Sequence, residues 1–286
     1  MAYRSPIKPK RHSTLAAAAL MAVSIAILAG MGAINFLMKA PTLDSSTLCR
    51  ADQPVTAHTV VLVDTTDALD HLQMAQLRAA IYDARDGLPQ YGKLTVLFLS
   101  TKTPYEPTEV ISLCNPGSWH ATNPLYQNPE RIRRIWTRDF AKKIDGAVAG
   151  LAHAPTAKLS PILEAITGIS WRPDFSRRIA IRRLVIISDF LEYDPGVFSL
   201  YKVANPWSRY MRSGLVSRTQ ADLSGVAIRA VMLHRPEWVN LQSHTLRDFW
   251  RRWFLDCGVT TVHFRSSLPG QARPKEEPRL SLRGGR

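Results

Sequence analysis

The hydrophobic pattern of the chain begins with one long apolar run near the N-terminus. Residues 15–38 contain no charged side chain, and a helix of that length, at about 1.5 Å per residue, crosses a hydrocarbon core about 30 Å thick. Residues 1–14 hold four basic side chains and no acidic one, which predicts a cytoplasmic N-terminus. We therefore expect an uncleaved anchor that crosses the inner membrane once, with the rest of the chain in the periplasm. A cleaved signal peptide is the alternative.

Shorter apolar runs follow and predict buried β-strands, because they are continuous and rich in β-branched residues. They are residues 59–63, 94–99, 184–188, 226–233 and 259–264. Residues 109–113 form another such run. It follows the second strand after a loop that is too short for a parallel crossover, so we predict an antiparallel edge strand there.

Segments with apolar residues at helical spacing lie between these runs. The predicted helices are 67–85, with Asp67 as the N-cap, and 130–151, 160–169 and 245–257. Strands that alternate with helices indicate an α/β fold. We predict a doubly wound, mostly parallel six-stranded sheet with one antiparallel edge strand and helices on both faces, spanning residues 58–265. The composition of 39–57 is typical of a linker and that of 266–286 of a basic disordered tail.

The charge of the chain narrows the classes of partner. Lys and Arg number 37 against 23 Asp and Glu, which gives a formal net charge of +14, so acidic partners are favoured. Two predicted helices are rich in arginine, at 131–138 and 247–252. Because the predicted topology places them outside the cytoplasm, we expect a solvated face, an acidic partner protein or anionic lipid headgroups rather than nucleic acid.

The chain has three cysteines, too few for a disulfide scaffold and without a Cys-x-x-Cys metal motif. In an oxidising periplasm Cys49 and Cys114 could pair, which would leave Cys257 as a buried thiol on its helix. At most one disulfide within the chain is expected.

Two of the predicted strands end in aspartate. Asp64 follows the apolar run that ends at Val63, and Asp189 follows the run that ends at Ser188. Ligands bind at the carboxyl ends of strands in such sheets, and carboxylates with hydroxyl groups nearby suit a hard cation such as Mg²⁺. The alternative is a site without metal, in which Asp64 caps the following helix and Asp189 accepts hydrogen bonds from loop amides.

Three stretches together resemble the von Willebrand factor A-like fold and its metal-ion-dependent adhesion site. They are Asp64-Thr65-Thr66-Asp67-Ala68, Ser160-Pro161-Ile162-Leu163-Glu164-Ala165-Ile166, and Asp189 after its strand. The resemblance covers roughly 58–265 and implies Mg²⁺ ligands at Asp64, Thr66, Ser160 and Asp189. Ala68 departs from the family motif, because it stands where the second hydroxyl ligand would be.

The resemblance implies a protein-binding domain that is not an enzyme. We expect a membrane-anchored scaffold component of a bacterial envelope complex, with another envelope protein as partner and no small-molecule substrate. An aromatic-rich segment, 190–225, follows Asp189, and aromatic side chains are enriched at protein interfaces. The candidate partner-binding residues are Tyr193, Phe198, Tyr201 and Trp207.

A magnesium-dependent phosphate-ester hydrolase of the haloacid-dehalogenase type is the alternative function. It would use Asp64 and Asp189, which lie at strand ends as that chemistry requires. Its Asp-x-Asp motif needs a second acid two residues after the nucleophile, whereas Thr66 stands there.

Overall fold

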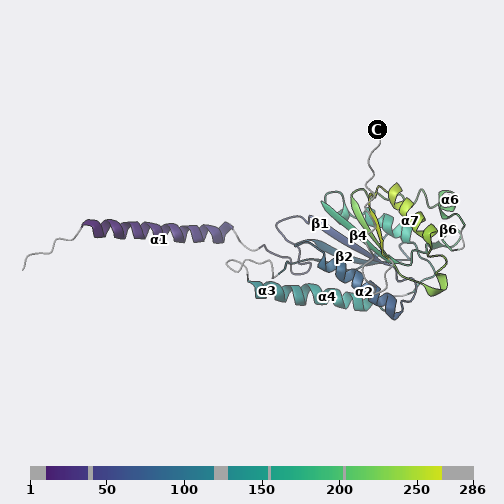
Figure 1. The fold of residues 1–286 in the computed structure, drawn as a ribbon, viewed down its shortest axis with the longest axis horizontal. Coiled ribbons are helices and arrows are strands. Elements are labelled where there is room, and N and C mark those ends of the chain that lie inside the picture. Colours follow the sequence, from purple (N-terminus) through teal and green to yellow (C-terminus); the bar gives the residue numbers. More distant parts are fainter. Residues whose placement is uncertain (1–10, 38–40, 119–127, 154–155, 202–203, 266–286) are drawn as a thin grey trace, which may run out of the picture.

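The fold was obtained as a computed structural model, which describes residues 11–37, 41–118, 128–153, 156–201 and 204–265. A six-stranded sheet forms its centre (Figure 1). The strands of this sheet are β1 (Ala57–Val63), β2 (Lys93–Phe98), β3 (Thr108–Cys114), β4 (Ile181–Ser188), β7 (Val226–Met232) and β8 (Val262–Arg265). The predicted α/β class and mostly parallel sheet are confirmed, since only β3 pairs antiparallel among these strands.

The strand order is β3-β2-β1-β4-β7-β8. The predicted antiparallel strand therefore lies at an edge of the sheet, next to β2. A hairpin of β5 (Tyr193–Asp194) and β6 (Phe198–Ser199) stands apart from the sheet. We call the edge where the parallel strands begin the amino edge, and the edge where they end the carboxyl edge.

The helices follow the strands along the chain. They are α2 (His71–Asp86), α3 (Pro129–Arg134), a π-helical segment (Ile135–Ala141), α4 (Lys142–Leu151), α5 (Ile162–Ser170), α6 (Pro206–Met211) and α7 (His244–Asp256). From α3 to α4 the chain is one continuous helical segment, as the spacing over 130–151 predicts. Its middle turns are wider than an α-helix, which the spacing alone does not indicate.

Several predicted boundaries differ from the structure, and hydrogen bonds explain two of the differences. The helix after β1 begins at His71, because Asp70 rather than Asp67 is its N-cap. The Asp70 carboxylate accepts from Gln73 N at 2.7 Å, and Gln73 Oε1 accepts from Asp70 N at 2.9 Å, which is a capping box. At the other end of the domain β8 begins at Val262, since the N–H of Val259 donates to the carbonyl of Phe254 and extends the turn after α7.

Buried apolar side chains form two clusters, and consecutive residues of β1 alternate between them. Val60 and Leu62 belong to a cluster with residues of α5 and α7, whereas Val61 and Val63 belong to a cluster with residues of α2 and α4. Successive side chains of a strand point to opposite faces of its sheet. Strand β1, which ends at the carboxyl edge, therefore contributes side chains to both clusters.

The segment before β1 is attached to the amino edge. Cys49 and Cys114 are joined by a disulfide, and Cys114, at the end of β3, lies opposite Lys93 at the start of β2. The N–H of Cys114 also donates to the carbonyl of Thr47 at 2.8 Å. Residues 41–56, which have linker composition, are thus held against the domain. Cys257 is the free, buried thiol at the end of α7.

The N-terminal helix α1 (Arg11–Leu37) extends away from the domain (Figure 1). It contains one stretch long and apolar enough to cross a membrane, Leu15–Ala33, and that stretch is exposed. A signal sequence near an N-terminus passes the same test of length and composition, so this stretch agrees with a membrane anchor or with a signal sequence.

Candidate functional site

The candidate site lies at the carboxyl edge, where the winding of the sheet reverses. The strands β1 and β4 are neighbours, and the chain proceeds outward from them in opposite directions. Crevices form at such switch points in open α/β sheets. Asp64 continues the β1–β4 ladder, since its N–H donates to the carbonyl of Ile187 at 2.9 Å. Asp189 follows β4 at the same edge, so the two carboxylates meet there.

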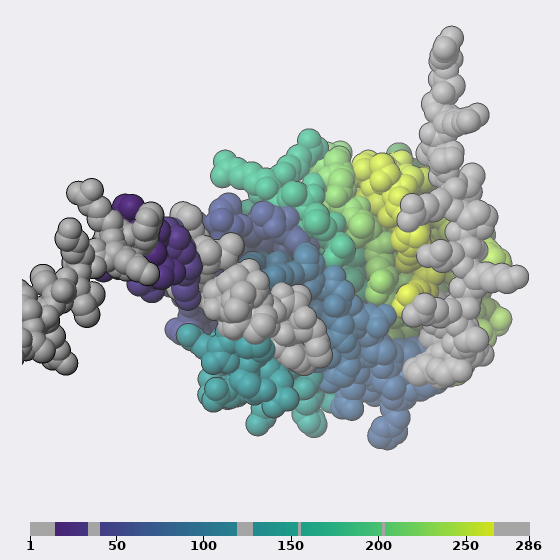
Figure 2. Space-filling model, turned by 60° about the vertical axis from the view of Figure 1, so that its left-hand side comes forward, coloured from purple at the N-terminus to yellow at the C-terminus, as the bar shows by residue number. Residues whose placement is uncertain are grey.

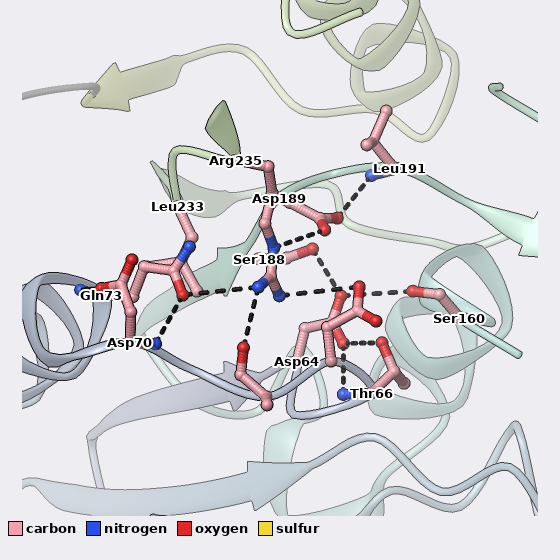
Figure 3. A network of polar contacts seen from close by, with 12 residues as sticks. Asp64, Thr66, Asp70, Gln73, Ser160, Ser188, Asp189, Leu191, Leu233 and Arg235 are labelled. Atoms are coloured by element: carbon pink, nitrogen blue, oxygen red, sulfur yellow. Dashed lines mark hydrogen bonds and ion pairs between the residues drawn. The ribbon is translucent and has the colours of Figure 1, made fainter. Parts of the chain in front are cut away.

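Asp64 accepts four hydrogen bonds (Figure 3). Thr66 gives Oδ1 two of them, from its N–H at 3.0 Å and from its hydroxyl at 2.6 Å. The hydroxyls of Ser160 and Ser188 donate to Oδ2 at 3.2 and 2.8 Å. Asp64 is 6% exposed. The structure thus brings three of the four predicted ligands into direct contact, with each hydroxyl donating to the carboxylate.

Arg235 is the central residue that sequence reasoning missed. It is 7% exposed, and its Nε donates to Asp189 Oδ2 at 3.2 Å. Its Nη1 donates to the carbonyl of Ala68 at 2.9 Å, and Nη2 lies 3.6 Å from Asp67 Oδ2. Two glutamines fix the guanidinium and its backbone, because Gln73 Oε1 accepts from Nη1 at 3.4 Å and Gln242 Oε1 accepts from the Arg235 N–H at 2.8 Å.

A sequence signal for Arg235 exists. It lies just after β7, so it reaches the carboxyl edge by the same rule that places Asp64 and Asp189 there. Its partners are remote in sequence, and the pairing itself follows only from the fold.

Asp189 lies beside this guanidinium and is 4% exposed. Its Oδ1 accepts from the N–H of Leu191 at 2.9 Å, as the metal-free alternative expects of a loop amide. Burial raises the pKa of Asp189, and the nearby charge of Asp64 raises it further, while Arg235 opposes both effects. The guanidinium therefore offsets part of the cost of holding two carboxylates together in a buried site.

The backbone is strained directly after Asp189. Phe190 has a φ of 64°, which is rare for a residue with a side chain. Its N–H donates to Ser188 Oγ at 2.8 Å, and its carbonyl accepts from Trp250 Nε1 at 2.9 Å. Both bonds hold the conformation that directs Asp189 toward Arg235. Strain of this kind gathers at functional sites.

The four predicted magnesium ligands make hydrogen bonds with protein groups in this structure. Both oxygens of Asp189 and both oxygens of Asp64 accept hydrogen bonds from protein groups. Ala68 supplies no hydroxyl, and its carbonyl accepts from the guanidinium. No three His, Cys, Asp or Glu side chains converge on a possible metal position within the described residues. A positive charge is already present, on Arg235.

Aromatic side chains lie next to the buried polar network. Tyr201 packs edge-to-face against Tyr193 at 5.7 Å and against Trp238 at 5.1 Å between ring centroids. The carboxylates of Asp189 and Asp64 act on Tyr201, whose pKa is raised first by burial and then by these charges. Tyr193 is 37% exposed. We call Tyr193, Tyr201 and Trp238 the aromatic row; Trp238 was not predicted.

Two predicted partner-binding residues have other surroundings. Phe198 is 1% exposed and packs against Tyr210 and Phe249, so its side chain lies in the core of the domain. A β6 side chain that points into the core cannot reach a partner. Trp207 is half-buried, and Arg252 stacks over its ring at 4.3 Å from the centroid.

Two buried glutamates form a second acidic pair near the site. Glu192 accepts from the N–H of Leu163 at 2.9 Å, and Glu164 lies close enough for the two carboxyl groups to interact. Burial raises the pKa of both groups, that of Glu192 far above its usual value. Sequence reasoning missed this pair, because Glu164 lies within an otherwise apolar helix.

No protein-family model matches the chain, and no curated protein matches its sequence.

Proposed function

We propose that the chain is a membrane-anchored scaffold protein whose domain binds another protein of a bacterial envelope. In this proposal α1 crosses the inner membrane once, the N-terminus is cytoplasmic, and the domain lies in the periplasm. The basic residues before α1 support that orientation. The disulfide between Cys49 and Cys114 supports an oxidising compartment.

The domain is proposed to be a doubly wound, von Willebrand factor A-like fold with helices on both faces of its sheet. Two buried clusters, each with its own pair of helices, support this arrangement. The strand order also agrees, since a doubly wound sheet reverses direction at its central pair of strands.

One observation carries the binding function: a rigid, buried charge network lies directly beside a partly exposed aromatic row. Asp64, Asp189 and Arg235 hold the carboxyl edge in place through hydrogen bonds that leave few groups free to react. Tyr193 is exposed next to them, and the half-buried Tyr201 packs against its ring. Aromatic side chains on a preorganised support are typical of protein-binding surfaces.

The geometry favours binding over phosphate-ester hydrolysis. A nucleophilic carboxylate must reach its substrate, whereas Asp64 is 6% exposed and accepts four hydrogen bonds. In the proposed mode a partner contacts the aromatic row, and Arg235 supplies the positive charge that a metal ion would otherwise supply.

Site-specific photocrosslinking in cells tests this proposal. A photoreactive residue at position 193 is expected to give a discrete adduct with one envelope protein, and Tyr201→Ala should remove that adduct. Position 255, which is exposed at the far end of α7, is the matched control and should give none. Equal adducts at both positions would contradict a binding surface at the carboxyl edge, and phosphatase activity lost in Asp64→Asn would favour the hydrolase.

A further inference from the structure

We propose that the basic segment that begins at α3 binds anionic phospholipid headgroups of the membrane that α1 crosses. The basic segment consists of Arg131, Arg133, Arg134, Arg138, Lys142 and Lys143. The inference rests on the proposed membrane anchor and goes beyond the proposed protein binding, which takes place at the opposite edge of the sheet.

The tether determines which end of the domain faces the membrane. α1 ends at Leu37, and Cys49 is already bonded to Cys114 at the amino edge. At about 3.5 Å per residue, the chain between Leu37 and Cys49 reaches about 40 Å at most. The tether thus joins the domain at its amino edge, and in the proposed arrangement this edge faces the membrane while the carboxyl edge with its aromatic row faces away.

The basic segment begins at this same end. The chain enters α3 after β3, which ends at the amino edge, and it leaves α4 toward the carboxyl edge, where Ala157 N–H donates to the carbonyl of Thr66 at 2.8 Å. Figures 1 and 2 both place α3, coloured teal, on the side of the domain from which α1 extends.

The helical segment is longer than the sheet that it covers. Its three parts have six, seven and ten residues, which at about 1.5 Å per residue amounts to about 34 Å. β1 has seven residues, or about 23 Å. No residue of α3 is buried, whereas Ile144, Val148 and Leu151 of α4 are. The α3 end therefore projects from the domain.

The exposed charge of this end is strongly positive. Within residues 128–143 six cations face only two acids, Glu130 and Asp139. These acids lie 3.5 Å from Arg133 and 2.8 Å from Arg138, which leaves an excess of four positive charges. Arg133, Arg134, Thr137 and Arg138 line one open surface at this end. The planar guanidinium matches the geometry of a phosphate group.

The apolar side chains of the segment face the domain. Ile135 and Trp136 pack against the buried cluster of α2 and α4, and Arg85 lies over the Trp136 ring at 5.4 Å from its centroid. The arginines are therefore the outermost side chains of the segment. Anionic headgroups attract such a segment within about a Debye length of the surface, roughly 10 Å at moderate salt.

Hydrogen exchange of the full-length protein in lipid nanodiscs tests the inference. We compare discs of phosphatidylcholine with discs that contain about one third phosphatidylglycerol, and expect amides 129–143 to exchange at least about threefold more slowly in the anionic discs. About 0.5 M NaCl should remove this difference, because salt screens the attraction. The Arg131→Glu/Arg134→Glu variant should lose the difference as well.

The matched control is Arg209→Glu/Arg212→Glu, which changes one exposed arginine of α6 and the exposed arginine directly after it. It should keep the slower exchange of the wild type. Equal exchange in both lipids with the chain retained in the discs would overturn the headgroup contact alone, as would loss of the effect in the control. A chain that is not retained in the discs would overturn the membrane anchor, and the headgroup contact with it. Because the discs contain no partner protein, slower exchange there separates lipid from an acidic protein as the ligand.

Discussion

Arg235 connects the strand ends of the candidate site more than any other residue. Its side chain contacts Asp189 after β4 and Ala68 and Gln73 around the start of α2. Removal of one partner from a buried ion pair leaves an unpaired charge and costs about 3–5 kcal/mol. We therefore expect Arg235 to contribute to stability mainly because its guanidinium balances the charges of Asp189 and Asp67.

We expect Arg235→Ala to lower the free energy of unfolding by about 3–5 kcal/mol. Arg235→Lys should lose most of this stability too, because an ammonium cannot donate to Asp189 and Ala68 in the same fork geometry. Urea denaturation of the full-length chain in detergent measures the change, with Arg209→Ala on the surface as control. A loss below about 0.5 kcal/mol for Arg235→Ala, typical of surface positions, would contradict a structural role of the pair.

Magnesium should leave the wild type unchanged. A ligand at a hundred times its Kd stabilises the folded state by about 2.7 kcal/mol, so a working metal site would raise Tm in millimolar Mg²⁺ and EDTA would lower it. Because Arg235 already neutralises Asp189, we expect no shift in either condition. A saturable increase in Tm that Asp64→Asn abolishes would restore the metal-dependent mode.

His58 makes stability depend on pH in a defined direction. Its side chain is buried, with Nδ1 2.7 Å from the carbonyl of Asp174 and Nε2 2.8 Å from Thr95 Oγ1. Its pKa is lowered from 6.5 to about 4, mainly by burial and to a smaller extent by Lys93 and Arg172, while Asp174 opposes the shift. The neutral ring is favoured in the folded state, so the stability it contributes is present above pH 6.5 and is lost as the pH falls toward 4.

The expected loss is about 3 kcal/mol between pH 7.5 and 4. His58→Gln keeps a donor and an acceptor but does not titrate. Between pH 7.5 and 4 the wild type should therefore lose about 3 kcal/mol of its free energy of unfolding relative to His58→Gln. Comparison of the two proteins cancels the opposite effect of Asp189 and Glu192, whose raised pKa values stabilise the folded state as the pH falls. A constant difference across this range would contradict the lowered pKa of His58.

At the scale of elements, the sequence predicts strands better than helix ends. Continuous apolar runs locate the four inner strands, because strands buried on both faces leave few polar positions. They also mark the edge strands β3 and β8, which are only partly buried. The start of α2 is mispredicted because Asp67 and Asp70 are both acceptable N-caps, and only the reciprocal bonds with Gln73 select Asp70. The sequence does not predict the π-helical turns after α3. The spacing of apolar residues indicates which face of a helix is buried, but it does not indicate how many residues each turn contains.

The packing of α5 depends on one glycine. An ideal Cβ at Gly168 would lie 1.7 Å from the carbonyl oxygen of Tyr105, a backbone atom that cannot move by itself. We expect Gly168→Ala to destabilise the domain by about 3 kcal/mol or more, because the loop around Tyr105 must shift. Gly146→Ala is the control, since nothing lies within 4 Å of its Cβ; this helical position should gain about 0.5–1 kcal/mol. Equal effects of the two substitutions on urea denaturation would contradict the close approach.

At the scale of the whole molecule, only part of the candidate site can be predicted from the sequence. Asp64 and Asp189 could be placed at one edge because strand ends of a parallel sheet coincide. Arg235 lies 46 residues from Asp189, and Gln242, which positions it, lies in the turn before α7. Their pairing follows from which strand lies beside β4, and a hydrophobic pattern does not encode strand order. The same limit applies to Phe198, whose direction depends on how the β5–β6 hairpin folds over the core.

The disulfide joins the anchor to the domain and reports the compartment of the whole chain. Cys49 and Cys114 are 65 residues apart in the sequence. A disulfide that closes a loop of this length restricts the unfolded chain and stabilises the fold by about 4 kcal/mol. We expect dithiothreitol to destabilise the wild type by roughly this amount and to leave Cys49→Ser/Cys114→Ser unaffected, as urea denaturation would measure.

The same bond allows a test of topology in cells. Protein denatured from cells without reductant should take up one maleimide, at Cys257, because the other two cysteines are bonded. After reduction it should take up three. A periplasmic domain requires this difference, since the cytosol keeps thiols reduced. Three reactive thiols without reductant would place the domain in the cytoplasm. Because the basic segment at α3 could then face nucleic acid as well as lipid, that one result would also change the expected partners of the molecule.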